Sequence, residues 1–264
     1  MRNIAAAIVL VVAGIGLLAT RPSSAERQTQ NPAATREEAY RANNLGVALL
    51  EQFKYKEATD AFKRALQIDP KLALARINLS IALFNVPDLP GSQREAQAAI
   101  ALAPNAPQPH YIVGLIAKTQ ARPDDAVAPF QQVLKIDPND VGANVNLGQI
   151  YSTQRKFTEA IALFRVALAA EPYNATALYN LGTSLIRSGQ REEGQKVIAQ
   201  FQELRQRGSG TTLGNNYLEQ GRYADAVAST GNESDLVNKQ TPDVLFQDVT
   251  SSVLPAPTSC PSTA

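Results

Sequence analysis

The side chains that usually carry out catalysis are scarce in this sequence. It has one histidine, His110, and one cysteine, Cys260, and the two lie far apart in the chain. It contains no Cys/His spacing typical of a zinc site, no Gly-x-Ser-x-Gly motif and no Gly-Lys-Ser/Thr phosphate loop. His110 is best explained as a packing residue, and Cys260 cannot form a disulfide within the chain. We therefore expect no enzymatic activity, no metal and no cofactor.

Asparagines provide the most regular chemistry in the chain. Asn44, Asn78, Asn146 and Asn180 occupy equivalent positions at multiples of 34 residues, and Ile112 takes the remaining position. A carboxamide offers two donors and an acceptor, so a row of them could pair with the backbone of an extended peptide whatever its sequence. Alternatively, each amide bonds to a neighbouring helix and has a purely structural role.

The same 34-residue step organises the central part of the chain. Pro70, Pro104, Pro138 and Pro172 lie in register, and small and apolar residues recur between them. A fixed period of this length is typical of a helical repeat solenoid. The pattern resembles the tetratricopeptide repeat (TPR) family over roughly residues 39–206. The resemblance implies an all-α fold, a right-handed superhelix of five to six helix–turn–helix repeats. Five of these repeats span residues 39–72, 73–106, 107–140, 141–174 and 175–208.

Within each repeat, the spacing of apolar residues predicts two helices, A and B, joined by a short turn. In the first repeat the turn is expected at residues 52–54, and Pro70 ends helix B because proline lacks an N–H. Gly46 and Ala58 are small where we expect the two helices to cross closely. Phe62 is expected to fill the gap between this repeat and the next.

The family resemblance also implies that the A helices line a concave groove and carry the asparagine row on its inner wall. The candidate peptide-binding residues are Asn44, Asn78, Asn146, Asn180, Tyr40, Tyr111, Gln149, Tyr179 and Arg187. Some family members hold a C-terminal carboxylate in a clamp of lysine and arginine. The corresponding positions here are Asn43, Val47, Asn78, Gln108 and Ile112, of which only Asn78 matches, so the clamp is missing.

The N-terminus has the features of a secretory signal peptide. Met1-Arg2 is followed by an apolar run to Ala19 and by Ser23-Ser24-Ala25, which predicts cleavage after residue 25. The alternative is an uncleaved membrane anchor, although the run is short for a span of about 20 residues. We expect a periplasmic or secreted protein with no membrane contact after cleavage. Residues 26–38 form a lead-in, in which residues 35–38 predict a capping box.

After the fifth repeat the periodicity weakens. Leu213, Gly214 and Tyr217 predict a partial sixth repeat or cap over residues 209–230, and residues 231–264 form a polar tail predicted to be largely disordered. Its β-like run, residues 245–250, resembles the Phe-x-Asp-Val-Thr segment that precedes FG-GAP/VCBS propeller repeats. Such propellers occur in exported bacterial proteins of the ASPIC/UnbV type that begin with a TPR array. The propeller itself is absent from this sequence.

Composition and charge complete the prediction. The chain has 44% hydrophobic and 19% charged residues, which suits a folded protein. Its net charge is +1, and removal of Arg2 and Arg21 with the signal peptide leaves about −1, so no basic patch favours nucleic acid. We expect a non-catalytic exported scaffold that binds a partner protein or peptide, in extended form, in its groove. The alternative is an architectural spacer, or the N-terminal remnant of a TPR–propeller protein, with no groove ligand of its own.

Overall fold

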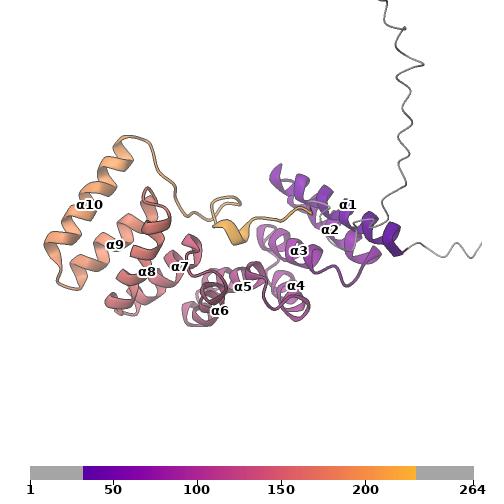
Figure 1. Ribbon diagram of the computed structural model, residues 1–264, viewed down its shortest axis with the longest axis horizontal. Helices are drawn as coiled ribbons and strands as arrows, with labels where there is room; N and C mark the ends of the chain where they lie inside the picture. Colours follow the sequence, from indigo (N-terminus) through magenta and orange to yellow (C-terminus); the bar gives the residue numbers. More distant parts are fainter. Residues whose placement is uncertain (1–31, 230–264) are drawn as a thin grey trace, which may run out of the picture. The chain divides into compact units, whose positions relative to one another are not determined.

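The computed structural model describes residues 32–229, and these contain ten α-helices (Figure 1). The predicted signal peptide and the β-like run at residues 245–250 lie outside the described residues. The helices are α1 Pro32–Glu51, α2 Tyr55–Ile68, α3 Ala73–Asn85, α4 Leu89–Leu102, α5 Pro107–Thr119, α6 Pro123–Ile136, α7 Val141–Thr153, α8 Phe157–Ala170, α9 Ala175–Arg187 and α10 Arg191–Gln206.

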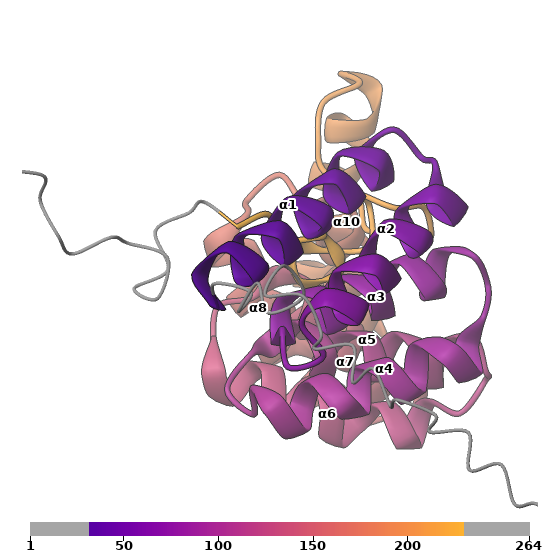
Figure 2. The same cartoon turned by 90° about the vertical axis from the view of Figure 1, so that its right-hand side faces the viewer.

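The helices pack in sequential pairs, and each pair also packs on the next. Each of the five predicted repeats contains one pair, with the odd-numbered helix as helix A and the even-numbered helix as helix B. In Figure 2, α3 and α5 lie nearer the centre of the array than α4 and α6. The predicted all-α solenoid is therefore confirmed. Among residues 32–229, no helix combines the length and the apolar character needed to cross a membrane.

Phenylalanine rings of the B helices nest against glycines of the A helices. A Cβ atom built on Gly46 would lie 2.5 Å from the Phe62 ring, and one on Gly148 would lie 2.6 Å from the Phe164 ring. Phe62 therefore packs over a glycine of its own repeat. The glycine is needed to make room for this ring, and not to let two helix backbones approach each other. In repeat five Ile198 replaces the phenylalanine, and the carbonyl of Gly194 comes within 3.1 Å of a Cβ on Gly182.

The turn between helices A and B has the same geometry in successive repeats. Phe53, Ala121, Arg155 and Gly189 of repeats one, three, four and five lie in register, at multiples of 34 residues, and all have positive φ angles, from 56° to 95°. The residue that follows closes each turn with a backbone hydrogen bond. In the first repeat, Lys54 N donates to Leu49 O at 3.0 Å. The turns lie where the sequence predicted them.

Helix α6 continues through Pro129, and α1 begins at Pro32, three residues before the predicted capping box.

Residues 209–229 do not form the predicted partial sixth repeat. They contain no α-helix and only a short 3-10 helix, η2, at Arg222–Ala224. Gly208 and Gly210 have φ angles of +62° and +136°, which end α10 and turn the chain. The apolar residues of this stretch pack against the existing repeats instead, as described below. We call residues 207–229 the return segment.

The nesting of glycine and phenylalanine can be tested in repeat four. Gly148→Ala is expected to lower stability by about 1–3 kcal/mol, because its Cβ would overlap the Phe164 ring. Phe164→Leu alone should also destabilise, since it leaves a gap in the core. Combined with Phe164→Leu, however, Gly148→Ala should cost much less. Urea denaturation of the four proteins measures this coupling, and strictly additive losses would contradict the packing described here.

Candidate functional site: the concave groove and the return segment

The return segment runs back along the A helices, from repeat five to repeat one (Figure 1). It begins with a β-bridge between Thr211 and Asn174, where Ala175 N donates to Thr211 O at 2.8 Å. Gln220 then reaches Tyr111 of repeat three, and Val227 and Ser229 reach repeats two and one. The chain thus occupies its own groove, in the direction opposite to the repeats.

Two asparagines of the predicted row bind the backbone of this segment in the same way. Asn78 Nδ2 donates to Val227 O at 2.8 Å, and Val227 N donates to Asn78 Oδ1 at 2.9 Å. Asn44 Nδ2 donates to Ser229 O at 3.0 Å, and Ser229 N donates to Asn44 Oδ1 at 2.8 Å. Residues two apart in an extended chain face the same side, and the intervening Ala228 is exposed. One step of the repeat therefore corresponds to two residues of extended backbone.

A third asparagine holds these amides in place. Asn43 Oδ1 accepts a hydrogen bond from Asn78 Nδ2 at 2.8 Å, and Asn43 Nδ2 donates to Asn44 Oδ1 at 3.2 Å. Asn43 and Asn78 are completely buried. Because a buried amide must have its donors and acceptors paired, this arrangement fixes which side of each carboxamide faces the segment. The amides are therefore oriented before they meet a backbone.

The other two asparagines of the row, Asn146 and Asn180, form no hydrogen bond with the backbone of the return segment within the described residues. Asn180 Nδ2 donates to Thr176 O of its own helix at 2.7 Å. Asn146 Nδ2 donates to Gly142 O at 2.8 Å and to Tyr111 Oη at 3.0 Å. Ile112, which interrupts the row, is fully buried and offers no polar group. Peptide binding by Asn146 and Asn180 remains a prediction.

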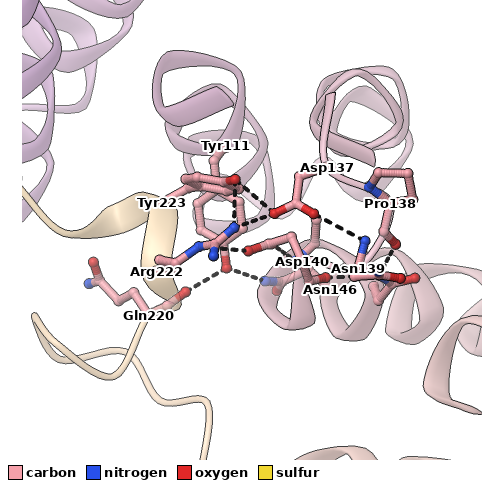
Figure 3. Close-up of polar contacts among 11 residues, drawn as sticks. Tyr111, Asp137, Pro138, Asn139, Asp140, Asn146, Gln220, Arg222 and Tyr223 are labelled. Atoms are coloured by element: carbon pink, nitrogen blue, oxygen red, sulfur yellow. Dashed lines mark hydrogen bonds and ion pairs between the residues drawn. The ribbon is translucent and has the colours of Figure 1, made fainter. Parts of the chain in front are cut away.

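Tyr111 is the point at which the return segment is held in the middle of the groove (Figure 3). Its side chain is fully buried, and its hydroxyl donates to Gln220 O at 2.6 Å. Gly142 and Gly221 lie so close to this hydroxyl that a Cβ atom on either would overlap it. Burial, and next the charge of Asp140, raise the pKa of Tyr111 well above its ordinary value, so it remains a neutral donor.

An ion-pair cluster lies beside Tyr111 (Figure 3). The Arg222 guanidinium of η2 forms an ion pair with Asp137, whose Oδ2 also accepts from Tyr223 Oη at 2.8 Å. Arg222 stacks over the Tyr223 ring at 4.6 Å, and its Nε lies 4.0 Å from Asp140 Oδ2. Asp140 is 4% exposed and caps α7 by accepting from Ala143 N at 2.7 Å. Its burial raises its pKa to about 6, although the Ala143 N–H and Arg222 act in the opposite direction.

An aromatic cluster holds the return segment against repeat one. Tyr217 is 3% exposed, and its ring centroid lies 6.5 Å from Phe53 and 6.4 Å from Tyr55 in edge-on geometry. Its hydroxyl accepts from Ala226 N at 3.1 Å. Tyr217 therefore connects the segment both to the α1–α2 turn and to the stretch that meets Asn78.

The remaining predicted groove residues have different surroundings. Tyr40 is half-buried and packs against a small cluster between repeats one and two. Tyr179 is 50% exposed, with its ring 5.3 Å from Phe201 of α10, and Arg187 is exposed at the end of α9. Gln149 is half-buried and accepts from Lys118 Nζ at 3.0 Å. Sequence reasoning missed Lys118, because no other repeat has a lysine at its position, and it predicted a partial sixth repeat or cap where the return segment lies.

Comparisons with known proteins agree with this architecture. The tetratricopeptide repeat family model matches residues 39–72, and two further tetratricopeptide repeat models match residues 130–162 and 153–207. Residues 39–72 and 130–207 of the chain therefore match tetratricopeptide repeats. No curated protein sequence is similar enough to count as a match.

Solved TPR structures share the fold. MamA from Desulfovibrio magneticus RS-1, from its residue 41 to the end, is 19% identical, with a TM-score of 0.58 over 65% of this chain and 97% of that chain. YrrB, described as a TPR protein with an unusual peptide-binding site, is 19% identical, with a TM-score of 0.54 over 69% of this chain and 93% of that chain. At these identities the likeness concerns the fold alone.

The described residues offer little to a metal. Within residues 32–229, no three His, Cys, Asp or Glu side chains are placed to hold a metal ion together. What the TPR groove presents instead is a set of oriented amides, a buried tyrosine hydroxyl and aromatic surfaces. These groups recognise a polypeptide backbone and hold it in a defined register.

The buried carboxyl of Asp140 predicts a pH dependence of stability. Its pKa is about 6 in the folded chain and 3.8 for the free group, so the folded state binds the proton more tightly. Its contribution to stability is therefore present at pH 4 and is lost as the pH rises through about 6. Asn is an equally good N-cap and does not titrate. The melting temperature of Asp140→Asn relative to wild type should therefore rise between pH 4 and pH 7.

Asp88→Asn is the matched control for this measurement. Asp88 also caps a helix, accepting from Gly91 N at 3.0 Å, but it is exposed. It reports the general effect of removing one capping carboxylate. If the Asp140→Asn difference stayed constant over this pH range, or followed that of Asp88→Asn, the described burial of Asp140 would be contradicted.

Proposed function

We propose that this TPR chain is a non-catalytic scaffold whose groove binds an extended segment of a partner protein through its backbone. The observation that carries the proposal is the paired hydrogen bonding of Asn44 and Asn78 to Ser229 and Val227. These contacts involve only main-chain atoms of the bound segment, so they accept many sequences. The return segment then represents how a partner segment would lie.

The free energies involved allow a partner segment to replace residues 226–229 in the groove. The four amide–backbone hydrogen bonds contribute about 0.5–1.5 kcal/mol each. Ordering the backbone of residues 226–229 costs about 1–2 kcal/mol per residue. The two terms are of similar size, so this end of the return segment is held weakly and a partner segment can replace it. Farther back, the buried Tyr111 and Tyr217 anchor the chain more firmly.

The class of ligand has support from a solved relative. YrrB is described as having a peptide-binding site, and the chain shares its fold over most of that chain's length. We therefore infer a peptide or a protein segment in extended form as the partner. The oriented amides of repeats one and two provide the contacts that such a ligand needs.

A labelled peptide with the sequence of residues 223–229 tests this proposal in the full chain. Val227→Pro with Ser229→Pro removes the two backbone donors that meet the asparagines, and should therefore free the groove. We expect the peptide to bind this variant more tightly than it binds wild type, as measured by fluorescence anisotropy. Ala228→Pro is the matched control, because residue 228 is exposed and its N–H meets neither asparagine.

Two further comparisons separate backbone recognition from other binding. N-methylation of the peptide at the valine and serine should abolish binding, whereas N-methylation at the intervening alanine should not. Asn44→Ala with Asn78→Ala should also abolish binding in the proline variant, with each lost hydrogen bond weakening it by about 0.5–1.5 kcal/mol. Equal binding of all the methylated peptides would contradict the proposal.

The alternative function is that of an architectural spacer or of an N-terminal remnant of a TPR–propeller protein. The observation that favours it is that the chain's own return segment covers the groove. Its resemblance to propeller proteins rests on residues 246–250. Failure of the peptide to enter the proline variant would favour a permanently covered groove, and so the spacer.

Export to the periplasm or the exterior is part of the proposed function, on the evidence of residues 1–25. The small residues Ser23 and Ala25 occupy the positions that a signal peptidase reads. N-terminal sequencing of the exported protein should therefore begin at Glu26. Recovery of chains that keep Met1, in a membrane fraction, would indicate an uncleaved anchor instead.

A further inference from the structure

A cavity of about 690 Å³ lies between the concave face and the return segment. Residues of α3, α5 and α7, with the α3–α4 turn and the first residue of α4, form one side of it, and residues 213–215 with Gln220 form the other. Its apolar lining residues are Phe84, Pro87, Leu89, Leu115 and Leu213, and it also carries amides, a hydroxyl and one charged group, Lys118. No acidic residue lines this cavity, and the return segment does not fill it.

Lys118 brings a positive charge into this cavity without an opposite charge. Its Nζ donates to Asn146 Oδ1 and, at 3.0 Å, to Gln149 Oε1, both neutral amides. Within residues 32–229 it forms no ion pair. Burial lowers its pKa to about 8, and no nearby acid opposes that shift. An ammonium taken out of water without a counter-charge is costly, and a bound anion would offset that cost.

Asn146 has hydrogen-bond partners of a different kind from those of Asn44 and Asn78. Its Oδ1 accepts from Lys118, and its Nδ2 is used by Gly142 O and Tyr111 Oη. It therefore positions the lysine, whereas Asn44 and Asn78 form hydrogen bonds with the backbone of the return segment. Gln220, 5% exposed, also lines the cavity and brings no charge to it. The cavity thus offers a single positive charge for an anion.

We propose that this cavity binds the carboxylate of an acidic side chain, Asp or Glu, of the partner segment held in the groove. The inference rests on the proposed function and names the partner's chemistry. A single cation between two neutral amides matches a monoanion, and the apolar walls match the methylene stem of the acidic residue. The acidic residues of the return segment, Glu219 and Asp225, do not line this cavity. A partner carrying an acid would therefore gain a contact that the chain's own segment lacks.

The test uses the full-length chain with isotopically labelled lysine and two small probes, N-acetyl-glutamate methylamide and its glutamine counterpart. NMR follows the Lys118 side-chain resonance during titration at pH 7. The glutamate probe is expected to shift that resonance and to raise the Lys118 pKa from about 8. The glutamine probe should do neither. Lys118→Met should weaken binding of the glutamate probe about tenfold or more, as expected for a hydrogen bond to a charged group.

The matched control is Lys63→Met, which removes an exposed lysine of α2 and should leave probe binding unchanged. Asn44→Ala with Asn78→Ala should also leave it unchanged, so this result can fail or succeed independently of backbone binding in the groove. Tighter binding of inorganic phosphate than of the glutamate probe would overturn the assignment to a side-chain carboxylate. An unchanged Lys118 pKa in the presence of the glutamate probe would overturn the site itself.

Discussion

A polypeptide that lies in a protein groove must have its N–H and C=O groups paired, and this requirement governs the structure around the return segment. Helices cannot supply those pairs from their own backbones, which are already bonded internally. Asn44 and Asn78 supply them with side-chain amides, one bidentate pair per repeat. The repeat spacing, the buried Asn43 that orients both amides, and the two-residue step of the bound chain all serve this single constraint.

The helical part of the molecule could be predicted well from its sequence. The period of 34 residues places the helix pairs and their turns, and it places the asparagines on the helices that bear the groove. The reason for the glycines could not be predicted, because whether Gly46 faces a backbone or the Phe62 ring depends on the packing angle. The start of α1 at Pro32 was also missed, since the capping-box pattern favoured a later start.

The return segment could not be predicted because its contacts are not local. Val227 pairs with an asparagine 149 residues earlier, and no periodic pattern in the sequence predicts that contact. The same holds for Lys118, which in the sequence looks like one of many solvated lysines on a helix. Its position in a partly closed cavity arises only when residues 213–220 cross the concave face. The groove therefore combines a predictable inner wall with an occupant that only the folded chain reveals.

Amide hydrogen exchange along residues 226–229 tests the central claim most directly. The account predicts protection at Val227 and Ser229, little at Ala228, and much less protection at all three than in the core of α7. Asn78→Ala should remove the protection of Val227, and Asn44→Ala that of Ser229. Equal exchange at the three positions would contradict the pairing, and protection as strong as that of Val145 in α7 would contradict a segment that a partner can replace.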